Sequence, residues 1–202
     1  MMGRRAVLLA GLLALVGSPM AHADAEVGAL APGFSVTDTR GRPYDLAALE
    51  GSYVVLEWFN NDCPFVNKHY ASDNMQRLQQ AYTAQGVVWL TIISSAPGRQ
   101  GSVSAAEANA IQRDRHAAQT GIVLDPTGAL GRLYGAKTTP HLFIISPAGV
   151  LIYAGAIDSE PSTDQADIAS AVNYVQRALD EAMAGKPVST PQTRPYGCSV
   201  KY

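Results

Sequence analysis

Residues 54–70, which read VVLEWFNNDCPFVNKHY, determine the fold expected for this chain. The apolar run over residues 53–59 predicts a buried strand. Pro64 predicts the start of a helix, because proline is favoured at the first helical position. Cys63 is therefore expected between a strand and a helix N-terminus, where free N–H groups and the helix dipole favour an anion. Such settings lower a cysteine pKa from about 8.5 to roughly 3.5–7.5, so the pattern predicts a reactive thiol.

A second apolar run follows at residues 87–93, which read VVWLTII and predict another buried strand. Between the two strands, apolar residues at helical spacing predict one helix from Pro64 to near Gly86: Val66, Tyr70, Met75, Leu78 and Tyr82. A strand–helix–strand unit of this kind implies parallel pairing. Alternation and a glycine-containing turn predict an N-terminal hairpin over residues 34–46.

The second half of the chain continues the alternation of strands and helices. Ser104 and Glu107 form a capping box, and Ser162 and Gln165 have the same spacing before a final amphipathic helix that ends near Gly185. The other expected elements, in order, are a helix over 105–119, a strand over 122–124, a helix over 129–134, strands over 141–145 and 150–154, and an irregular tail over 188–202. The pattern predicts an α/β fold with a central mixed sheet flanked by helices.

Composition describes an ordinary globular protein. The chain is 47% hydrophobic and 16% charged, with a net charge of −2, which argues against a nucleic-acid partner. Its two cysteines, Cys63 and Cys198, allow one intramolecular pair. Closing so long a loop with a disulfide would stabilise the fold by about 5 kcal/mol in the chain-entropy model. A purely structural pair is therefore one interpretation.

The first residues have the form of a secretory signal. Arg4 and Arg5 precede an apolar run over residues 6–16, and Ala-His-Ala at residues 21–23 has the form of a cleavage site. We expect a signal peptide over 1–23, one domain over 24–202 without a membrane span, and a periplasmic or secreted location after cleavage near Ala23. An uncleaved N-terminal anchor is the alternative. Disulfides persist in exported proteins, so a disulfide between Cys63 and Cys198 would be stable after export.

Five short motifs give the chain its resemblance to known proteins: NNDCPFV at 60–66, KHY at 68–70, TTPH at 138–141, YAGAID at 153–158 and YGCSVKY at 196–202. In this order they resemble a thioredoxin-like fold, and more specifically the peroxiredoxin-like redoxins of the AhpC/TSA type found among exported bacterial proteins. The sequence departs from both patterns. Asn60 stands at the first cysteine of Cys-x-x-Cys and at the threonine of the peroxiredoxin motif, and Leu56 stands at that motif's proline.

The resemblance assigns roles to particular residues. It implies that Cys63 is the nucleophile, that Cys198 resolves the oxidised Cys63 in a disulfide, and that His141 acts as a general acid. It implies substrate contacts from residues around the sulfur, with a cis bond before the proline of the second loop: Asn60, Asp62, Pro64, Thr139 and Pro140. It implies no cofactor, and Cys63 with His141 gives too few ligands for a metal site.

Other polar residues near the motif carry open interpretations. Lys68 is expected on a solvated helix face, and His69 either lies there or lowers the Cys63 pKa. Glu57 is either a buried carboxylate that relays protons or a solvated edge residue. Trp58 and Trp89 are expected in the core. The sequence offers Arg132 and Arg194 as weak counterparts of the peroxide-activating arginine.

Three functions remain open on the sequence. The first is an exported, peroxiredoxin-like antioxidant enzyme that takes a hydroperoxide and an external dithiol reductant. The second is thiol–disulfide exchange with a protein disulfide substrate. The third is a non-enzymatic binding or structural module with a fixed Cys63–Cys198 disulfide.

Overall fold

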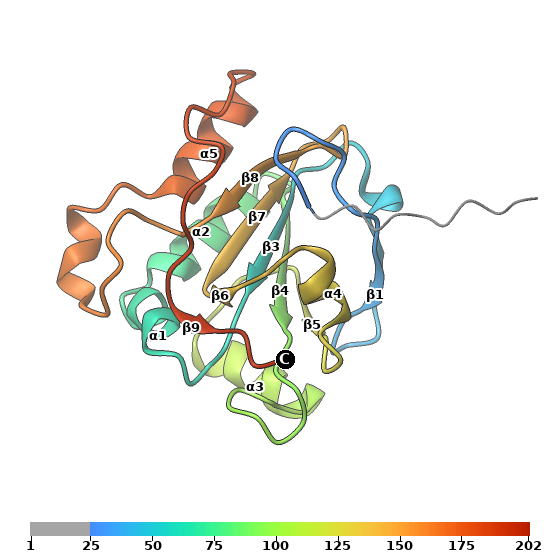
Figure 1. Ribbon diagram of the computed structural model, residues 1–202, viewed down its shortest axis with the longest axis vertical. Helices are drawn as coiled ribbons and strands as arrows, with labels where there is room; N and C mark the ends of the chain where they lie inside the picture. Colours follow the sequence, from blue (N-terminus) through green and yellow to red (C-terminus); the bar gives the residue numbers. More distant parts are fainter. Residues whose placement is uncertain (1–24) are drawn as a thin grey trace, which may run out of the picture.

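The computed structural model describes residues 25–202, and a five-stranded mixed sheet forms its centre (Figure 1). β3, β4 and β5 pair in parallel, whereas β7 pairs antiparallel with both β3 and β8. The order across the sheet is β5 (Gly121–Leu124), β4 (Val88–Ile93), β3 (Val54–Trp58), β7 (His141–Ile145) and β8 (Leu151–Gly155). The thioredoxin-like α/β fold is thus confirmed, and the predicted signal peptide lies outside the described residues.

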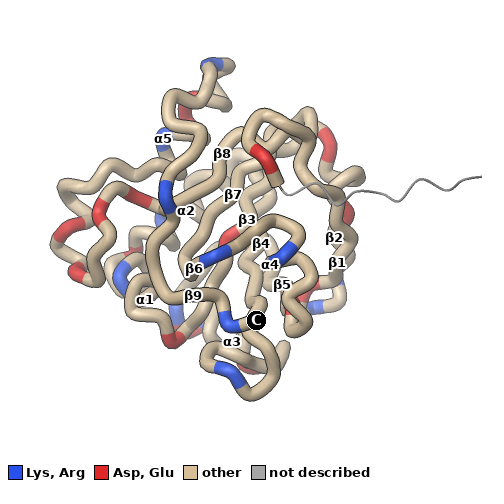
Figure 2. The backbone as a smooth tube through the Cα atoms, in the orientation of Figure 1, with Lys and Arg blue, Asp and Glu red and all other residues tan. Residues whose placement is uncertain are grey.

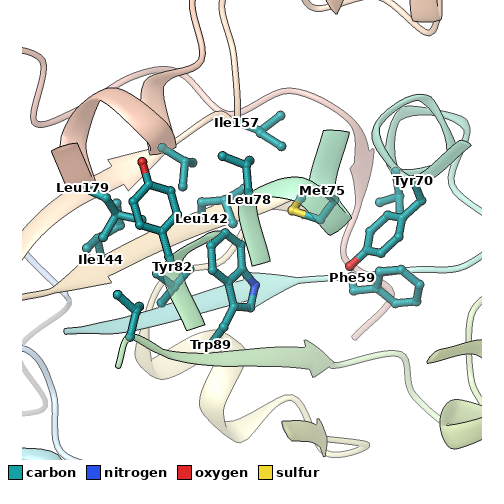
Figure 3. Packing of buried hydrophobic residues seen from close by; sticks show 14 of the residues in the cluster. Phe59, Tyr70, Met75, Leu78, Tyr82, Trp89, Leu142, Ile144, Ile157 and Leu179 are labelled. Atoms are coloured by element: carbon teal, nitrogen blue, oxygen red, sulfur yellow. The ribbon is translucent and has the colours of Figure 1, made fainter. Parts of the chain in front are cut away.

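Helices cover one face of this sheet and form the larger of two cores. The helices that contribute are α1 (Pro64–Ala71), α2 (Asn74–Thr83), α3 (Ala105–Asp114) and α5 (Tyr174–Met183). In Figure 3, Met75, Leu78 and Tyr82 of α2 lie over Trp89 and Leu142 of the sheet. Every residue of β3 is buried, Glu57 included, as expected for a central strand that is covered on both faces.

The opposite face is covered by the N-terminal segment and by residues around α4 (Ala129–Leu133). The expected hairpin forms from β1 (Ser35–Thr37) and β2 (Pro43–Asp45), and a 3-10 turn, η1 (Ala47–Leu49), follows it. Trp58 points into this second core and Trp89 into the first, so both tryptophans are core residues as predicted.

The helix predicted from Pro64 to Gly86 is two helices. The Ser72 hydroxyl donates to the Lys68 carbonyl oxygen (2.7 Å), and Asp73 takes a left-handed φ of 56°. A serine hydroxyl that occupies a helix carbonyl competes with the backbone ladder, so α1 ends after two turns. This break makes α1 a short, separate helix behind Cys63.

Two later helix boundaries were also predicted wrongly. The α3 helix ends at Asp114, and His116 beyond it takes a positive φ of 51°. The last helix begins only at Tyr174, where the Asn173 side chain caps it by accepting the Gln176 N–H. The spacing of Ser162 and Gln165 does not produce a capping box, because Ser162 donates to Asp167; a 3-10 turn, η2 (Gln165–Ala169), forms there.

The C-terminal tail is irregular as expected, but it is fixed on the domain. It first runs beside β8, where Gln192 bridges Ala154, and then crosses the lower end of the sheet in Figure 1. There it forms a two-residue strand, β9 (Cys198–Ser199), antiparallel to β6 (Thr138–Thr139). Figure 2 shows Lys and Arg positions spread over helices, loops and this tail.

Candidate active site around Cys63 and Cys198

Cys63 lies at the point where the central strand leads into α1. It is the N-cap residue of α1 with an extended backbone (φ −85°, ψ 122°), and Pro64 occupies the first helical turn as predicted. The Cys63 side chain is fully buried, at 0% exposure. Pro64, the next residue, is exposed.

Two neighbours from distant parts of the chain meet the Cys63 sulfur. The Thr139 carbonyl oxygen lies 3.0 Å from Cys63 Sγ, and Cys198 Sγ lies 2.9 Å from it. The second distance exceeds the roughly 2.05 Å of a covalent S–S bond, and both residues are free thiols. The predicted pair is therefore in contact without a bond between the sulfurs.

The surroundings of Cys63 favour its thiolate. Burial by itself would raise the pKa of the thiol, but hydrogen bonds from the Cys198 side chain and the Val66 backbone outweigh burial and lower that pKa below its ordinary value. The Val66 N–H belongs to the first turn of α1, where amides have no helical partner. The N-terminus of α1 thus lowers the Cys63 pKa, as expected, and the Val66 N–H is the donor that does so.

Cys198 has the opposite character. Burial, with the neighbouring Cys63 sulfur, raises the pKa of Cys198 to about 11. Its side chain is half-buried, and β9 holds its backbone opposite Thr139. The geometry therefore makes Cys63 the more acidic of the two thiols, so that Cys63 ionises before Cys198.

The Thr139–Pro140 peptide bond is cis, which confirms the prediction for Pro140. Thr139 is brought to the sulfur through its carbonyl oxygen, and its buried hydroxyl oxygen has no hydrogen-bond partner among the described residues. This loop and the start of α1 together form the two sides of the site.

Asn60 and Asp62 hold the loop before Cys63. The Asn60 side-chain oxygen accepts the Asp62 N–H (2.9 Å), and the Asp62 carboxylate accepts the Gly101 N–H (3.2 Å). Asn60 packs so closely on Gly101 that a Cβ at Gly101 would lie 2.3 Å from the Asn60 oxygen. These contacts position the loop and supply no group to the sulfur, so substrate contacts from Asn60 and Asp62 stay a prediction.

His141 lies away from the sulfur. Its ring packs on Phe143 in the second core, at 4.3 Å between centroids, and its Nδ1 accepts the Lys137 N–H (3.2 Å). Burial lowers the pKa of His141 to about 3. A neutral imidazole in the core that does not contain Cys63 is poorly placed to be its general acid, although the sequence places it directly after Pro140.

Lys68 is not on a solvated helix face, because its side chain is fully buried. Its Nζ donates to the Glu160 carbonyl oxygen (2.7 Å) and lies 3.6 Å from Asp158 Oδ2. His69 lies beside it, and burial lowers the pKa of His69 to about 4, so the ring is neutral at neutral pH. Tyr196 of the tail donates its hydroxyl to Asp158 and completes the cluster.

Glu57 is the buried carboxylate of the two predicted alternatives. It accepts hydrogen bonds from four side chains, with donor–oxygen distances of 2.7–3.3 Å: Tyr70, Gln79, Trp89 and Thr91. Burial nevertheless raises its pKa above the ordinary value. Tyr70 belongs to the same helix as Cys63, so Glu57 holds α1 against the sheet.

Sequence reasoning did not single out Asp158, Tyr196 or Arg115. Arg115 donates to the Asn61 side chain (2.8 Å) and to Asn67, so it fixes the loop and helix around Cys63 without touching the sulfur. Asp158 and Tyr196 lie inside the quoted motifs YAGAID and YGCSVKY, which was the available signal.

Two further properties concern the described part of the chain. No group of three or more His, Cys, Asp or Glu side chains gathers there in a way that could hold a metal ion. Nor does any helix within residues 25–202 have the length and apolar character needed to cross a bilayer.

Comparison with known proteins agrees with this geometry. Residues 27–154 match the AhpC/TSA family. The chain belongs to the AhpC/TSA family. This AhpC/TSA chain is therefore a thiol oxidoreductase with a thioredoxin-like fold. The matched residues include Cys63 and the cis-proline loop but end before the tail that carries Cys198.

Solved structures share the fold of this AhpC/TSA chain. A hypothetical protein from Sinorhizobium meliloti 1021 has a TM-score of 0.73 and 22% identity, over 89% of this chain and 96% of its own. An uncharacterized conserved protein from Geobacillus kaustophilus has a TM-score of 0.73 and 24% identity, over 88% and 92%. A putative thiol:disulfide interchange protein DsbE from Chlorobium tepidum has a TM-score of 0.52 and 23% identity, over 65% and 85%. No curated protein matches the sequence.

Proposed function

We propose that this protein is an exported thiol oxidoreductase that reduces hydroperoxides, with Cys63 as nucleophile and Cys198 as resolving cysteine. The observation that carries the proposal is the contact between two sulfurs of unequal acidity, 2.9 Å apart. The lowered pKa of Cys63 supplies the attacking thiolate, and the raised pKa of Cys198 keeps its proton in place.

The reaction follows from that pair in three balanced steps. The Cys63 thiolate attacks the outer peroxide oxygen, the O–O bond breaks, and the leaving alkoxide takes a proton to become an alcohol or water. Cys63 is then a sulfenic acid, which Cys198 attacks to form an S–S bond and release water. An external dithiol exchanges with that disulfide, restores both thiols and leaves as a disulfide.

Access to the sulfur favours a small oxidant. Cys63 is fully buried beneath the tail, so a protein disulfide must displace β9 from β6 before it reaches the sulfur. A hydroperoxide requires a far smaller opening. The described surroundings of the sulfur include no arginine contact, and Asn60 packs against Gly101, so we expect modest peroxide turnover.

The test is hydrogen peroxide consumption in the presence of dithiothreitol. We expect consumption by the wild type that Cys63→Ser abolishes, with both proteins equally folded by circular dichroism. Equal consumption by the two proteins would rule out the peroxidase proposal.

A second candidate, thiol–disulfide exchange, is favoured by the pairing of a cysteine-bearing strand with Thr139 beside the cis-proline. In that reaction the Cys63 thiolate attacks a substrate disulfide, a mixed disulfide forms, and Cys198 releases the substrate as a dithiol. Insulin reduction that depends on Cys63, without peroxide turnover, would identify this activity. A reduction potential of the pair below about −300 mV, with neither activity, would instead identify a structural disulfide.

The same proposal includes export and the domain boundary. It is supported by Arg4, Arg5 and the apolar run over residues 6–16, followed by the cleavage pattern at 21–23. We expect mass spectrometry of the protein from a bacterial periplasm to give a mature N-terminus near Asp24. A full-length chain retained in the membrane fraction would favour the uncleaved anchor.

A further inference from the structure

The tail holds Cys198 at the site with little regular structure. The strand β9 has two residues, and only Cys198 and Ser199 pair with β6. Two hydrogen-bonded residue pairs are far below what an isolated strand pairing needs for stability. Something other than the strand must therefore fix the sulfur of Cys198 against that of Cys63.

Tyr196, two residues before Cys198, belongs to a directed chain of hydrogen bonds that ends at Asp158. The Asn74 amide donates to His69 Nδ1 (2.9 Å), which leaves His69 Nε2–H to donate to the Tyr196 oxygen (3.2 Å). The Tyr196 hydroxyl in turn donates to Asp158 Oδ1. Asn74, His69 and Tyr196 each donate to the next group in this chain. The Asp158 carboxylate at the end of the chain is paired with Lys68.

Several side chains that contact Tyr196 belong to α1, the short helix that Cys63 caps. Cys63 caps α1, and the Tyr196 ring lies against two other α1 side chains, Phe65 (5.8 Å between centroids) and Lys68 (Nζ 5.8 Å from the ring). A helix of eight residues is a rigid spacer. It therefore sets the position of the Tyr196 ring relative to the Cys63 sulfur.

The Tyr196 ring is packed on the side of α1 and lines a cavity elsewhere. One side of the tail borders a cavity of about 560 Å³, lined by residues that include Thr138, Asp158 and Tyr196 itself. Burial and the neighbouring Asp158 carboxylate raise the pKa of Tyr196, so its hydroxyl keeps the proton that it donates. The two hydrogen bonds of the Tyr196 hydroxyl thus fix the position of this side chain next to the cavity.

We infer that Tyr196, bound by Asp158 and His69, is a positioning residue that holds Cys198 against Cys63 for disulfide formation. The inference rests on the proposed function, because it takes Cys198 as the resolving thiol. Its physical basis is effective concentration: a tail already anchored in the dithiol state loses little further freedom when the disulfide closes.

Tyr196→Phe tests the inference, since it keeps the ring on Phe65 and removes only the hydroxyl. Tyr53→Phe is the matched control, because the Tyr53 hydroxyl also donates one hydrogen bond (2.9 Å, to Ala182) but is not among the contacts of either cysteine. The measurement is the equilibrium constant of the Cys63–Cys198 disulfide in glutathione buffers, read by mass spectrometry.

For Tyr196→Phe we expect an equilibrium constant lower by about tenfold, the order expected for one hydrogen bond to a charged group. Tenfold corresponds to about 30 mV for this two-electron couple. Tyr53→Phe should keep the wild-type constant, and both variants should keep a folded circular dichroism spectrum. A wild-type constant in Tyr196→Phe, or an equal loss in Tyr53→Phe, would overturn the inference.

Failure of the proposed function gives a different result. If the wild type, oxidised by peroxide without an external thiol, keeps a dimedone-reactive Cys63 sulfenic acid as Cys198→Ser does, Cys198 is not the resolving thiol and the proposed function fails together with this inference. If only Cys198→Ser keeps the sulfenic acid while Tyr196→Phe keeps the wild-type equilibrium constant, the proposed function stands and only the positioning role is refuted.

Discussion

Cys63 lies where a buried strand meets a helix, whereas Cys198 lies on a two-residue strand in an irregular tail. The first cysteine is positioned by backbone structure, and its helix supplies an amide donor. The second is positioned by side chains that grip the tail on both sides of it. Tyr196 binds Asp158, and Tyr202 packs on Arg132 (4.6 Å) and donates to the Ala136 carbonyl oxygen (2.8 Å).

The comparison teaches how one fold can make two thiols unlike each other. A sulfur at a helix start receives N–H groups, and its pKa falls even though it is fully buried. A sulfur on a tail that covers the first one receives no such donors, and its pKa rises to about 11. Secondary structure thus positions Cys63 and lowers its pKa, whereas contacts between distant side chains position Cys198.

The largest expected effect comes from removing the tail cysteine. In Cys198→Ser, Cys63 still reacts with peroxide, but nothing resolves the sulfenic acid within the chain. After one equivalent of peroxide without an external thiol, we expect dimedone to label Cys63 in Cys198→Ser but not in the wild type, which has closed its disulfide. Equal dimedone labelling of the two proteins would contradict the proposed roles of the two cysteines.

Next in size is the loss of the carboxylate that holds α1 to the sheet. Glu57→Ala leaves four buried donors without their acceptor, so we expect it to lower the free energy of unfolding by about 3–5 kcal/mol. Urea denaturation followed by tryptophan fluorescence measures this. A change in the free energy of unfolding below about 1 kcal/mol would show that Glu57 does not hold α1 against the sheet.

Glu57→Gln serves as the control and adds a pH test. The folded-state pKa of Glu57 is raised above 4.5, so its protonated form is favoured by folding. That contribution to stability is complete below about pH 4.5 and is lost as the pH rises through the raised pKa. Stability of the wild type relative to Glu57→Gln should therefore decline over that window, and a constant difference would refute the raised pKa.

A smaller effect is expected where the tail approaches the cis-proline loop. Gly197 has a φ of 134°, and a Cβ there would lie 2.1 Å from the Thr139 carbonyl oxygen. Gly197→Ala must therefore push β9 away from β6, and we expect about a tenfold fall in the disulfide equilibrium constant. Gly135→Ala is the matched control, because Gly135 also has a positive φ (64°) but open space around its Cβ. An unchanged constant in Gly197→Ala would mean that the close contact is not needed.

The smallest effect is a difference in titration that requires no substitution. Carbon-13 shifts of the two labelled cysteine Cβ atoms should report one ionisation below the ordinary thiol pKa, from Cys63, and a second near 11, from Cys198. The reverse assignment, or two coincident ionisations, would contradict the conclusion that the two thiols differ in acidity.

The sequence predicts the Cys63 half of the site well and the Cys198 half poorly. The strand, Pro64 and the reactive cysteine are encoded within one local stretch, and the cis bond follows from a family resemblance. The contacts of Tyr196 and Asp158 join residues 38 positions apart in the chain. No local pattern encodes such a contact, and the same holds for the ion pair that places Lys68 in the interior.

Local signals also failed where side chains compete for the backbone. Ser72 interrupts a helix whose apolar spacing continues through it, and Asn173, rather than Ser162, caps the last helix. His141 follows Pro140 directly, yet strand alternation turns its ring into the core opposite Cys63. Adjacency in sequence was a poor guide there, because successive side chains of a strand point to opposite faces.

The tail has a consequence that reaches beyond redox chemistry. Strand β8 is an outer strand of the sheet, and the tail covers its free side: Ala154 donates to the Pro191 carbonyl oxygen (3.1 Å) and accepts the Thr193 N–H (3.1 Å). A bare outer strand is a template for aggregation between chains. A movement of Cys198 that hinges after Thr193 would leave these two hydrogen bonds in place, and the outer strand would stay covered.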